Sequence, residues 1–240
     1  MRNALLIARR ELGAYLRTMS GYVIIAGVLF ADGLLFNAFA MGEATRLSAE
    51  ILGNFFYLSS GSTIVCAILL SMRLLAEERQ NKTLVLLYSS PIADWEIVLG
   101  KYLSAVAFLA LFLVATFHIP ALVMVYGKVS LGHVAAGYLG LLLLGSATLA
   151  IGTFGSSLTS SQVLAAIGTA LIVVALIVAH LLVKVTEAPL KEVFGGLAYW
   201  LHFLPFQQGM VQLRDVVYFA LVTYLALFGA VRVLEARRWQ

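Results

Sequence analysis

RLLAEERQNKTLVLLYSSPIADWEIVLGK, residues 73–101, is a dense polar segment in a chain that is otherwise mostly hydrocarbon. The side chains in it that are charged at neutral pH are Arg73, Glu77, Glu78, Arg79, Lys82, Asp94 and Glu96. A chain does not need such a loop to cross a bilayer. The segment therefore predicts a docking surface on one side of a membrane, with long apolar segments before and after it.

The composition excludes an ordinary soluble domain. Of the 240 residues, 62% are hydrophobic and 12% are charged, and the mean hydropathy is +0.97. Soluble domains carry about 25% charged residues, so this much apolar surface requires lipid as its solvent. The net charge of +4 then indicates basic residues gathered on the cytoplasmic side, and we expect no nucleic-acid partner. Cys66 is the only cysteine, so the chain cannot form an internal disulfide.

Six apolar segments are each long enough to cross a bilayer as a helix of about 20 residues. A backbone in lipid must satisfy its own hydrogen bonds, and the segments lack the period-two alternation of a barrel. We predict an all-α integral membrane protein in which residues 1–240 form a single transmembrane domain. We expect no cleaved signal peptide, because no continuous apolar core precedes the first span. The predicted spans are Ser20–Met41, Gly53–Leu75, Gly100–Tyr126, His133–Leu158, Gln162–Lys184 and Asp215–Leu234.

The basic residues predict an orientation with both termini in the cytoplasm, because eleven then lie inside and five outside. The inside set is Arg2, Arg9, Arg10, Arg17, Arg73, Arg79, Lys82, Lys101, Arg232, Arg237 and Arg238, and the outside set is Arg46, Lys128, Lys184, Lys191 and Arg214. Aromatic residues fit the same orientation. Trp95 and Trp239 would lie at the inner interface, and the outer interface would hold Tyr126, Tyr199 and Trp200.

Residues 1–18 predict a helix lying on the membrane surface. Apolar side chains recur on one face at 100° per residue, beside an arc of arginines. The face holds Leu5, Ala8, Leu12, Tyr15 and Leu16, and the arc holds Arg2, Arg9, Arg10 and Arg17. This pattern is typical of an interfacial amphipathic helix whose arginines meet anionic headgroups. The alternative is a disordered basic tail, and we favour the helix because the stripe continues over four turns.

The polar loop itself contains a short apolar helix, predicted over Thr83–Tyr88. Asn81 or Thr83 can cap its start, and Pro91 ends it because the residue before proline avoids helical geometry. Asp94 can cap the helix that leads into the third span. The leucines of this short helix must be buried in a partner, or against the protein's own helices and the lipid surface, and composition alone leaves both open.

Asp32 lies near the middle of the first span, where an ionisable side chain costs about 2.5–3.5 kcal/mol to insert. It is therefore a candidate site. Polar side chains at comparable depth in the first two spans are Asn37, Ser59, Ser60, Ser62 and Thr63. Together these side chains could line a transport path. Alternatively, Asp32 is protonated and hydrogen-bonded to a serine between packed helices.

The histidines His118, His133, His180 and His202 fall toward the predicted outer face. Histidines on facing helices can bind heme or copper. None of these four has metal-ligand spacing in the sequence, and histidine is stable at a wet interface. We therefore predict no metal site.

Two further segments indicate packing more than chemistry. A small-residue face in the fourth span predicts close helix contact and comprises Gly145, Thr148, Gly152, Gly155 and Ser156. The outer loop, residues 185–212, has glycines and prolines between short apolar pieces. It predicts two brief helices at or dipping into the outer interface, where they could cap a path or receive a partner.

Two stretches resemble the ABC-2 type permeases. The run LLAEER…TLVLLYSSPIADWEIVLGKYL resembles their intracellular loop, which reads approximately AEER, GT, an apolar run, SSP or RP, and a helix ending in GK. The stretch FQQGMVQLRDVVYFALVTYLALFGAVRVLEARRW is similar to the last span of the gliding-motility-associated branch, with its glycine, RD pair, aromatic residue and closing RRW. The layout is similar over the whole chain. Lys82 stands where the family usually has glycine before the threonine.

The resemblance implies that this chain is one half of a transporter in the bacterial inner membrane, and more specifically one half of an exporter. Two six-helix permeases would face each other as a homodimer or heterodimer, surrounded by lipid and assisted by a periplasmic accessory protein. Each would dock an ATP-binding subunit through the loop of residues 76–99. The implied coupling residues are Glu77, Glu78, Arg79, Thr83, Leu84, Leu87, Ser90 and Pro91. ATP and Mg²⁺ would bind to the partner subunit, and this chain would bind no cofactor. We expect that the chain is not itself an enzyme, and it lacks a GxxxxGK[ST] loop.

Two other classes of function fit the sequence less well. A proton-coupled secondary carrier would use Asp32 and a histidine, but the halves show no internal repeat and the polar loop would have no purpose. A membrane enzyme would need a nucleophile–base pair or a metal constellation, and neither is evident. The sequence therefore predicts an ABC-2 permease subunit.

Overall fold

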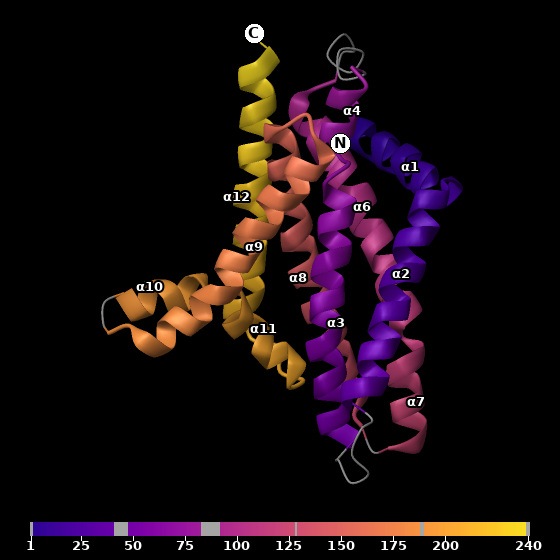
Figure 1. The fold of residues 1–240 in the computed structure, drawn as a ribbon, viewed down its shortest axis with the longest axis vertical. Coiled ribbons are helices and arrows are strands. Elements are labelled where there is room, and N and C mark those ends of the chain that lie inside the picture. Colours follow the sequence, from indigo (N-terminus) through magenta and orange to yellow (C-terminus); the bar gives the residue numbers. More distant parts are fainter. Residues whose placement is uncertain (1, 41–47, 83–91, 128, 188–189, 239–240) are drawn as a thin grey trace.

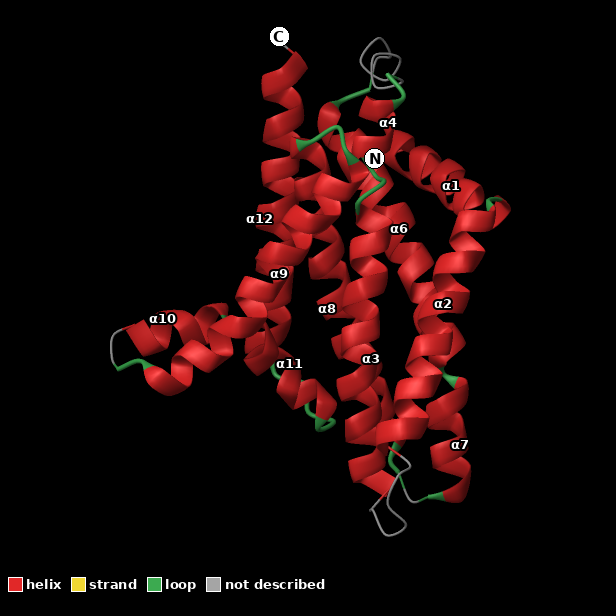
Figure 2. Cartoon of the chain, viewed as in Figure 1, coloured by secondary structure: helices red, strands yellow, loops and turns green. Residues whose placement is uncertain are grey.

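The computed structural model describes residues 2–40, 48–82, 92–127, 129–187 and 190–238, and within these ranges every regular element is a helix (Figure 2). Six helical segments are long and apolar enough to cross a membrane: Gly21–Ala38, Ala49–Gln80, Asp94–Val125, Leu131–Leu158, Gln162–Val185 and Leu213–Arg237. The prediction of an all-α membrane protein with six spanning segments is thus confirmed. Both ends of the chain lie at the same end of the bundle (Figure 1), which we call the termini end.

The described elements, in chain order, are α1 (Arg2–Arg17), α2 (Met19–Leu35), the π-helical turn η1 (Phe36–Ala40), α3 (Ser48–Ser71), α4 (Ala76–Gln80), α6 (Asp94–Thr116), α7 (His118–Tyr126), α8 (Leu131–Leu158), α9 (Gln162–Val185), α10 (Leu190–Leu197), α11 (Tyr199–Gln207) and α12 (Leu213–Arg238).

Helix α8 forms the centre of the bundle. Two-thirds of its span is buried, whereas less than a fifth of the spans in α2, α9 and α12 is buried. Its predicted small-residue face explains this position, because a Cβ at Gly145 would press on Leu109 and Thr63, and a Cβ at Gly152 would overlap the Ser71 hydroxyl. In lipid, helices associate through such close van der Waals packing.

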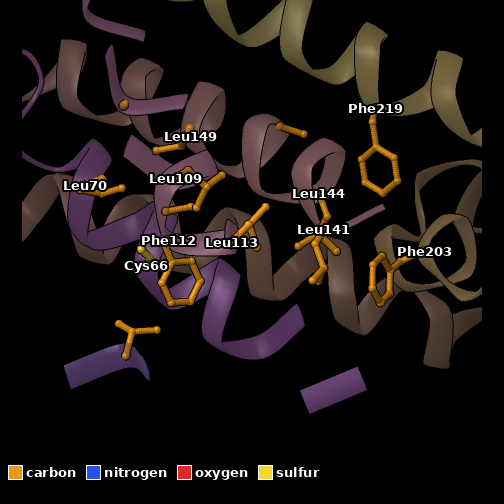
Figure 3. Packing of buried hydrophobic residues seen from close by; sticks show 14 of the residues in the cluster. Cys66, Leu70, Leu109, Phe112, Leu113, Leu141, Leu144, Leu149, Phe203 and Phe219 are labelled. Atoms are coloured by element: carbon orange, nitrogen blue, oxygen red, sulfur yellow. The ribbon is translucent and has the colours of Figure 1, made fainter. Parts of the chain in front are cut away.

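The core joins the central helices to the segment before the last span. Figure 3 shows Cys66 of α3, Leu109 and Phe112 of α6, and the leucines of α8 in one continuous cluster. The cluster extends to Phe203 of α11 and Phe219 of α12. The short helix α11 therefore belongs to the bundle and does not lie outside it.

The second span differs from its prediction at the termini end. The second span was predicted as one helix over Gly53–Leu75, but α3 ends at Ser71 and a turn over residues 72–75 precedes α4. The Ser156 hydroxyl of α8 accepts hydrogen bonds from the backbone N–H groups of Leu75 and Ala76, at 3.0 and 2.8 Å. A side chain inserted into the helical hydrogen-bond ladder breaks it, so the turn is fixed by α8.

The third span is also divided. It was predicted as one helix, but α6 ends at Thr116 and α7 starts at His118. Pro120 lacks the N–H that would bond to the carbonyl of Thr116, which accounts for the break. At its other end α6 begins at Asp94, with Ala93 as the cap residue, so the predicted capping by Asp94 was wrong.

The predicted N-terminal helix forms, and side chains outside the predicted stripe also pack on the bundle. Ala4 and Ile7 are buried, whereas Leu5 of the stripe is 64% exposed and its neighbour Leu6 is 61% exposed. Tyr15 of the predicted stripe does pack inward, with its ring 5.2 Å from that of Phe108. Helix α1 therefore has two apolar faces, one on the bundle and one on its surroundings.

The predicted outer loop does contain two brief helices, but one of them lies deeper than expected. The hydroxyl of Tyr199 donates a hydrogen bond to the carbonyl of Leu144, near the middle of α8. At the other end of α11, the Gln207 amide donates to the carbonyl of Gly53 near the start of α3. Tyr199 is thus buried at mid-depth, and its predicted place at the outer interface was wrong. Helix α11 re-enters the bundle.

Candidate functional site

The predicted coupling residues divide between α4 and the segment that follows it. Glu77, Glu78 and Arg79 form α4 with their neighbours at the termini end. The predicted apolar helix, with Thr83, Leu84, Leu87, Ser90 and Pro91, lies outside the described residues. The described site is therefore the base from which this segment starts.

A buried lysine organises that base. Lys101 of α6 is only 3% exposed, and its ammonium lies 2.8 Å from Oε1 of Glu78 in α4. It also lies 3.6 Å from Oε1 of Glu11 in α1. A buried lysine is stable only when it is paired, so this contact holds three separate elements to one another. We call Lys101, Glu78 and Glu11 the ion-pair junction.

Glu11 carries its charge at neutral pH. Burial alone would raise the pKa of Glu11, but the Lys101 ammonium and the Arg10 guanidinium outweigh it and lower that pKa below its ordinary value of 4.5. Arg10 Nη2 lies 2.8 Å from Glu11 Oε1. The depressed pKa of Glu11 contributes stability that is present above the ordinary value and is lost as the pH falls through the folded value.

Gly100 allows α1 to reach Lys101. A Cβ at Gly100 would lie 2.8 Å from the carbonyl oxygen of Ala4 and 2.8 Å from the Cβ of Ile7. Any larger side chain would push α1 away from α6. Gly100 therefore permits the contact between α1 and α6, and the adjacent Lys101 stabilises that contact through Glu11.

A polar cavity of about 240 Å³ opens beside the junction. Arg73 and Glu77 form a two-point ion pair along one side of it, at 2.9 and 3.1 Å. Its wall is formed by Glu11, Ala14, Tyr15, Thr18, Arg73, Leu74, Glu77, Glu78, Asn81 and Lys101. Glu77 and Glu78 thus form ion pairs within their own chain.

Lys82 gives the physical reason for the glycine of the ABC-2 pattern. Its φ is +57°, in the left-handed region, two residues after Gln80, where α4 ends. That conformation costs a non-glycine residue about 1–2 kcal/mol, and glycine is the usual residue there at a helix end. The departing segment therefore starts from a strained turn.

The candidate path residues form a different cluster. Asp32 of α2 is 1% exposed, and its carboxylate oxygens accept hydrogen bonds from Ser59 and Ser62 of α3 at 3.0–3.1 Å. Thr63 is also buried, while Asn37 is exposed in η1. The structure therefore joins Asp32 to two of the predicted serines across the α2–α3 contact.

The histidines take separate positions. Nδ1 of His118 contacts the carbonyl of Ala115 at the end of α6, and Nδ1 of His180 contacts a carbonyl of its own helix. Nε2 of His133 donates to the carbonyl of Gln207. His202 pairs with Asp215 of α12. Among the described residues, no group of three or more His, Cys, Asp or Glu side chains could hold a metal ion.

Sequence reasoning missed Lys101, Glu11 and Asp215 as site residues. A signal for Lys101 was present, since a lysine at the start of an apolar span needs an anionic partner. Its partners could not be named, because Glu11 and Glu78 belong to elements whose packing the sequence does not specify.

Comparison with known families identifies one match. The family model described as ABC-2 family transporter protein matches residues 18–230. No curated protein matches the chain. The matched range includes Glu78 and Lys101 of the junction, the Asp32 cluster and the His202–Asp215 pair.

The ion-pair junction predicts a large effect of removing its cation. Lys101→Met would leave the carboxylates of Glu78 and Glu11 without their buried partner, which we expect to cost about 3 kcal/mol. The melting temperature of the purified protein should fall accordingly, and Lys101→Arg should recover part of the loss.

Arg232→Met is the matched control. It removes a cation from an exposed ion pair with Glu235 near the termini end, and such pairs contribute little. Equal melting temperatures for Lys101→Met and Arg232→Met would show that the junction does not stabilise the fold.

Proposed function

The chain belongs to the ABC-2 transporter family, and from this premise we propose that it is the permease half of an exporter driven by a separate ATP-binding subunit. The observation that carries the proposal is the ion-pair junction beneath the polar loop. It supplies a mechanical connection between the loop and the spans. ATP and Mg²⁺ would bind the partner, and this family membership favours the ATP-driven permease over the proton-coupled carrier.

Two contacts would transmit a displacement of the polar loop to the membrane-spanning helices. Glu78 ties α4 to Lys101 at the start of α6, so a displaced α4 pulls on the third span. The Ser156 hydroxyl ties the turn before α4 to α8, at the centre of the bundle. A subunit that moves the loop on ATP hydrolysis would therefore tilt α6 against α8.

The coupling residues would have two different tasks. Glu77 and Glu78 form ion pairs within the chain and would hold the base of the loop in place. Thr83, Leu84, Leu87, Ser90 and Pro91 would form the surface that meets the ATPase. Their apolar side chains suit burial in a partner's groove.

The termini end would face the cytoplasm, because it gathers most of the basic residues. In a Cys66→Ala background, Lys82→Cys should be shielded from a membrane-impermeant thiol reagent in intact cells. Gln208→Cys, an exposed position beyond α11, should be labelled. The reverse labelling pattern would overturn the orientation and the docking proposal with it.

The docking proposal predicts that a charged side chain introduced into the loop weakens association with the ATPase. Leu84→Asp or Leu87→Asp should leave the protein inserted but reduce its association with the ATPase on the order of a hundredfold, because a buried charge would lack a partner. Co-purification of the two subunits measures this. Leu131→Asp, which places the same charge on an exposed leucine at the opposite end, is the control. Undiminished co-purification with all three variants would contradict the docking role.

Two copies of the permease would enclose the path, as a homodimer or heterodimer in the bacterial inner membrane. Asp32, Asn37, Ser59, Ser62 and Thr63 are the proposed lining. Because Asp32 is buried against α3, it would reach the path when α2 and α3 separate. A gliding-motility-type assembly with a periplasmic accessory protein near α10 remains part of this proposal, supported by the similarity of the last span.

Asp32→Asn tests the path assignment. The amide keeps the shape and most hydrogen bonds but removes any negative charge, so insertion should survive while transport in reconstituted vesicles falls on the order of tenfold. Asp32→Leu should lower thermal stability as well, because Ser59 and Ser62 lose their acceptor. Normal transport by the Asn variant would remove Asp32 from the functional residues.

A further inference from the structure

A cavity of about 410 Å³ lies where the start of α3, the start of α8 and the end of α11 meet, at the end of the bundle opposite the termini (Figure 1). Its polar side chains are Glu50 and Asn54 of α3, His133 of α8, Gln207 of α11 and Gln208 just beyond α11. None of them belongs to the ion-pair junction or to the Asp32 cluster. The cavity is therefore a separate site.

The cavity lies at the level where the spans begin. The spanning segments of α3 and α8 start at Ala49 and Leu131, and Glu50 and His133 follow within the first turn of each. The hydrocarbon core of a bilayer is bordered at this level by lipid headgroups and water. The proposed orientation places this boundary on the outer side. Both a lipid headgroup and a dissolved molecule can therefore reach the cavity.

Gln207 has one fixed orientation in the wall of the cavity. Its side-chain Nε2 donates a hydrogen bond to the carbonyl of Gly53 at 3.0 Å, and its backbone carbonyl accepts one from Nε2 of His133 at 2.9 Å. The Gly53 carbonyl can only accept, so the amide nitrogen and not the amide oxygen faces it. Gly209 permits this close approach, since its φ is +80° and a Cβ there would lie 2.9 Å from the His133 ring.

The side-chain oxygen of Gln207 requires a donor. Oε1 is buried and accepts no hydrogen bond from any residue in the described part of the chain. A buried acceptor without a donor is costly, and nearly all such atoms in folded proteins have a partner. Because an amide oxygen can only accept, the group that meets it must carry an N–H or an O–H.

The charge of the wall favours a cation. Among the described residues that line the cavity, Glu50 supplies a carboxylate and none is a lysine or an arginine. The two helix starts do not offer an anion site either. Glu50 itself stands in the first turn of α3, and the Ser130 hydroxyl caps α8 by accepting from the N–H of His133 at 3.3 Å. A group that combines a positive charge with N–H donors fits this wall.

We propose that the cavity binds a primary ammonium group, which donates one N–H to Oε1 of Gln207 while Glu50 balances its charge. Asn54 and Gln208 carry amides that both donate and accept, which suits the oxygen atoms attached to such an amine. Two sources share this chemistry: the ethanolamine headgroup of a phospholipid and a small free amine. A choline headgroup has the same charge but no N–H, so it would leave Oε1 without a donor. The site does not depend on ATPase docking, and its test needs no transport.

Lipid competition on the intact wild-type protein tests the donor requirement. Native mass spectrometry would follow the protein in detergent with equal amounts of phosphatidylethanolamine, phosphatidylcholine and phosphatidylglycerol of identical acyl chains. We expect phosphatidylethanolamine to be preferred about tenfold over phosphatidylcholine, because only it makes the charge-assisted hydrogen bond. Glu50→Gln, a change of an exposed side chain, should remove most of this preference. Glu192→Gln makes the same change on an exposed position of α10 outside the cavity and should behave as the wild type.

A second measurement distinguishes the two sources. The side-chain amide NMR signal of Gln207, identified by its loss in Gln207→Met, would be followed in phosphatidylcholine nanodiscs. A shift on adding ethanolamine assigns the site to a small amine, and a shift only on incorporating phosphatidylethanolamine assigns it to a lipid headgroup. Both outcomes support an ammonium site. The proposal is overturned by equal retention of the ethanolamine and choline lipids together with no response to ethanolamine, by an unchanged preference in Glu50→Gln, or by glycerol shifting the signal as strongly as ethanolamine.

Discussion

The burial of one ammonium group, that of Lys101, constrains the whole termini end of the protein. A lysine that is 3% exposed cannot be left without anionic partners, and its partners lie on two other elements. The surface helix α1 and the short helix α4 must therefore both meet α6. Gly100 removes the steric obstacle to this arrangement, because any Cβ there would collide with α1. In a protein whose other contacts are mostly apolar, this polar contact gives the elements a specific register.

Helix α8 applies a second constraint, through small side chains. Gly152 lets α3 approach until Ser71 fills the space, and Ser156 takes the backbone N–H groups that would otherwise continue the helix. The chain turns over residues 72–75 because the N–H groups of Leu75 and Ala76 bond to Ser156 and not to carbonyls of their own helix. As a result the polar loop departs from a fixed point between the centre of the bundle and the ion-pair junction. A loop anchored in this way would transmit a displacement, whereas a flexible linker would absorb it.

The sequence predicted the spans because hydrocarbon length is a local property, and it predicted the family because the loop motif is contiguous. It did not predict the break after Ser71, because the hydrogen-bond partner Ser156 lies 81 and 80 residues from Leu75 and Ala76. The depth of α11 escaped prediction for the same reason, since Tyr199 was assigned to an interface by residue type while its hydroxyl bonds Leu144. The burial of Ala4 and Ile7 in α1 was not predicted, because periodicity finds an apolar stripe but not the helix that covers it. The Asp32–Ser59–Ser62 contact was anticipated as an alternative, since a membrane carboxyl must find donors on the neighbouring helix.

Helix α12 joins the region of the ion-pair junction to the His202–Asp215 pair. Its first turn holds Asp215, and near its other end Ala230 and Leu234 pack against Leu75 and Val98, beside the turn before α4 and the start of α6. An α-helix transmits a displacement along its length because each backbone hydrogen bond resists stretching. Helix α12 therefore connects the turn before α4 and the start of α6 to the contact with α11, and a displacement of the loop would act on α12 along its length.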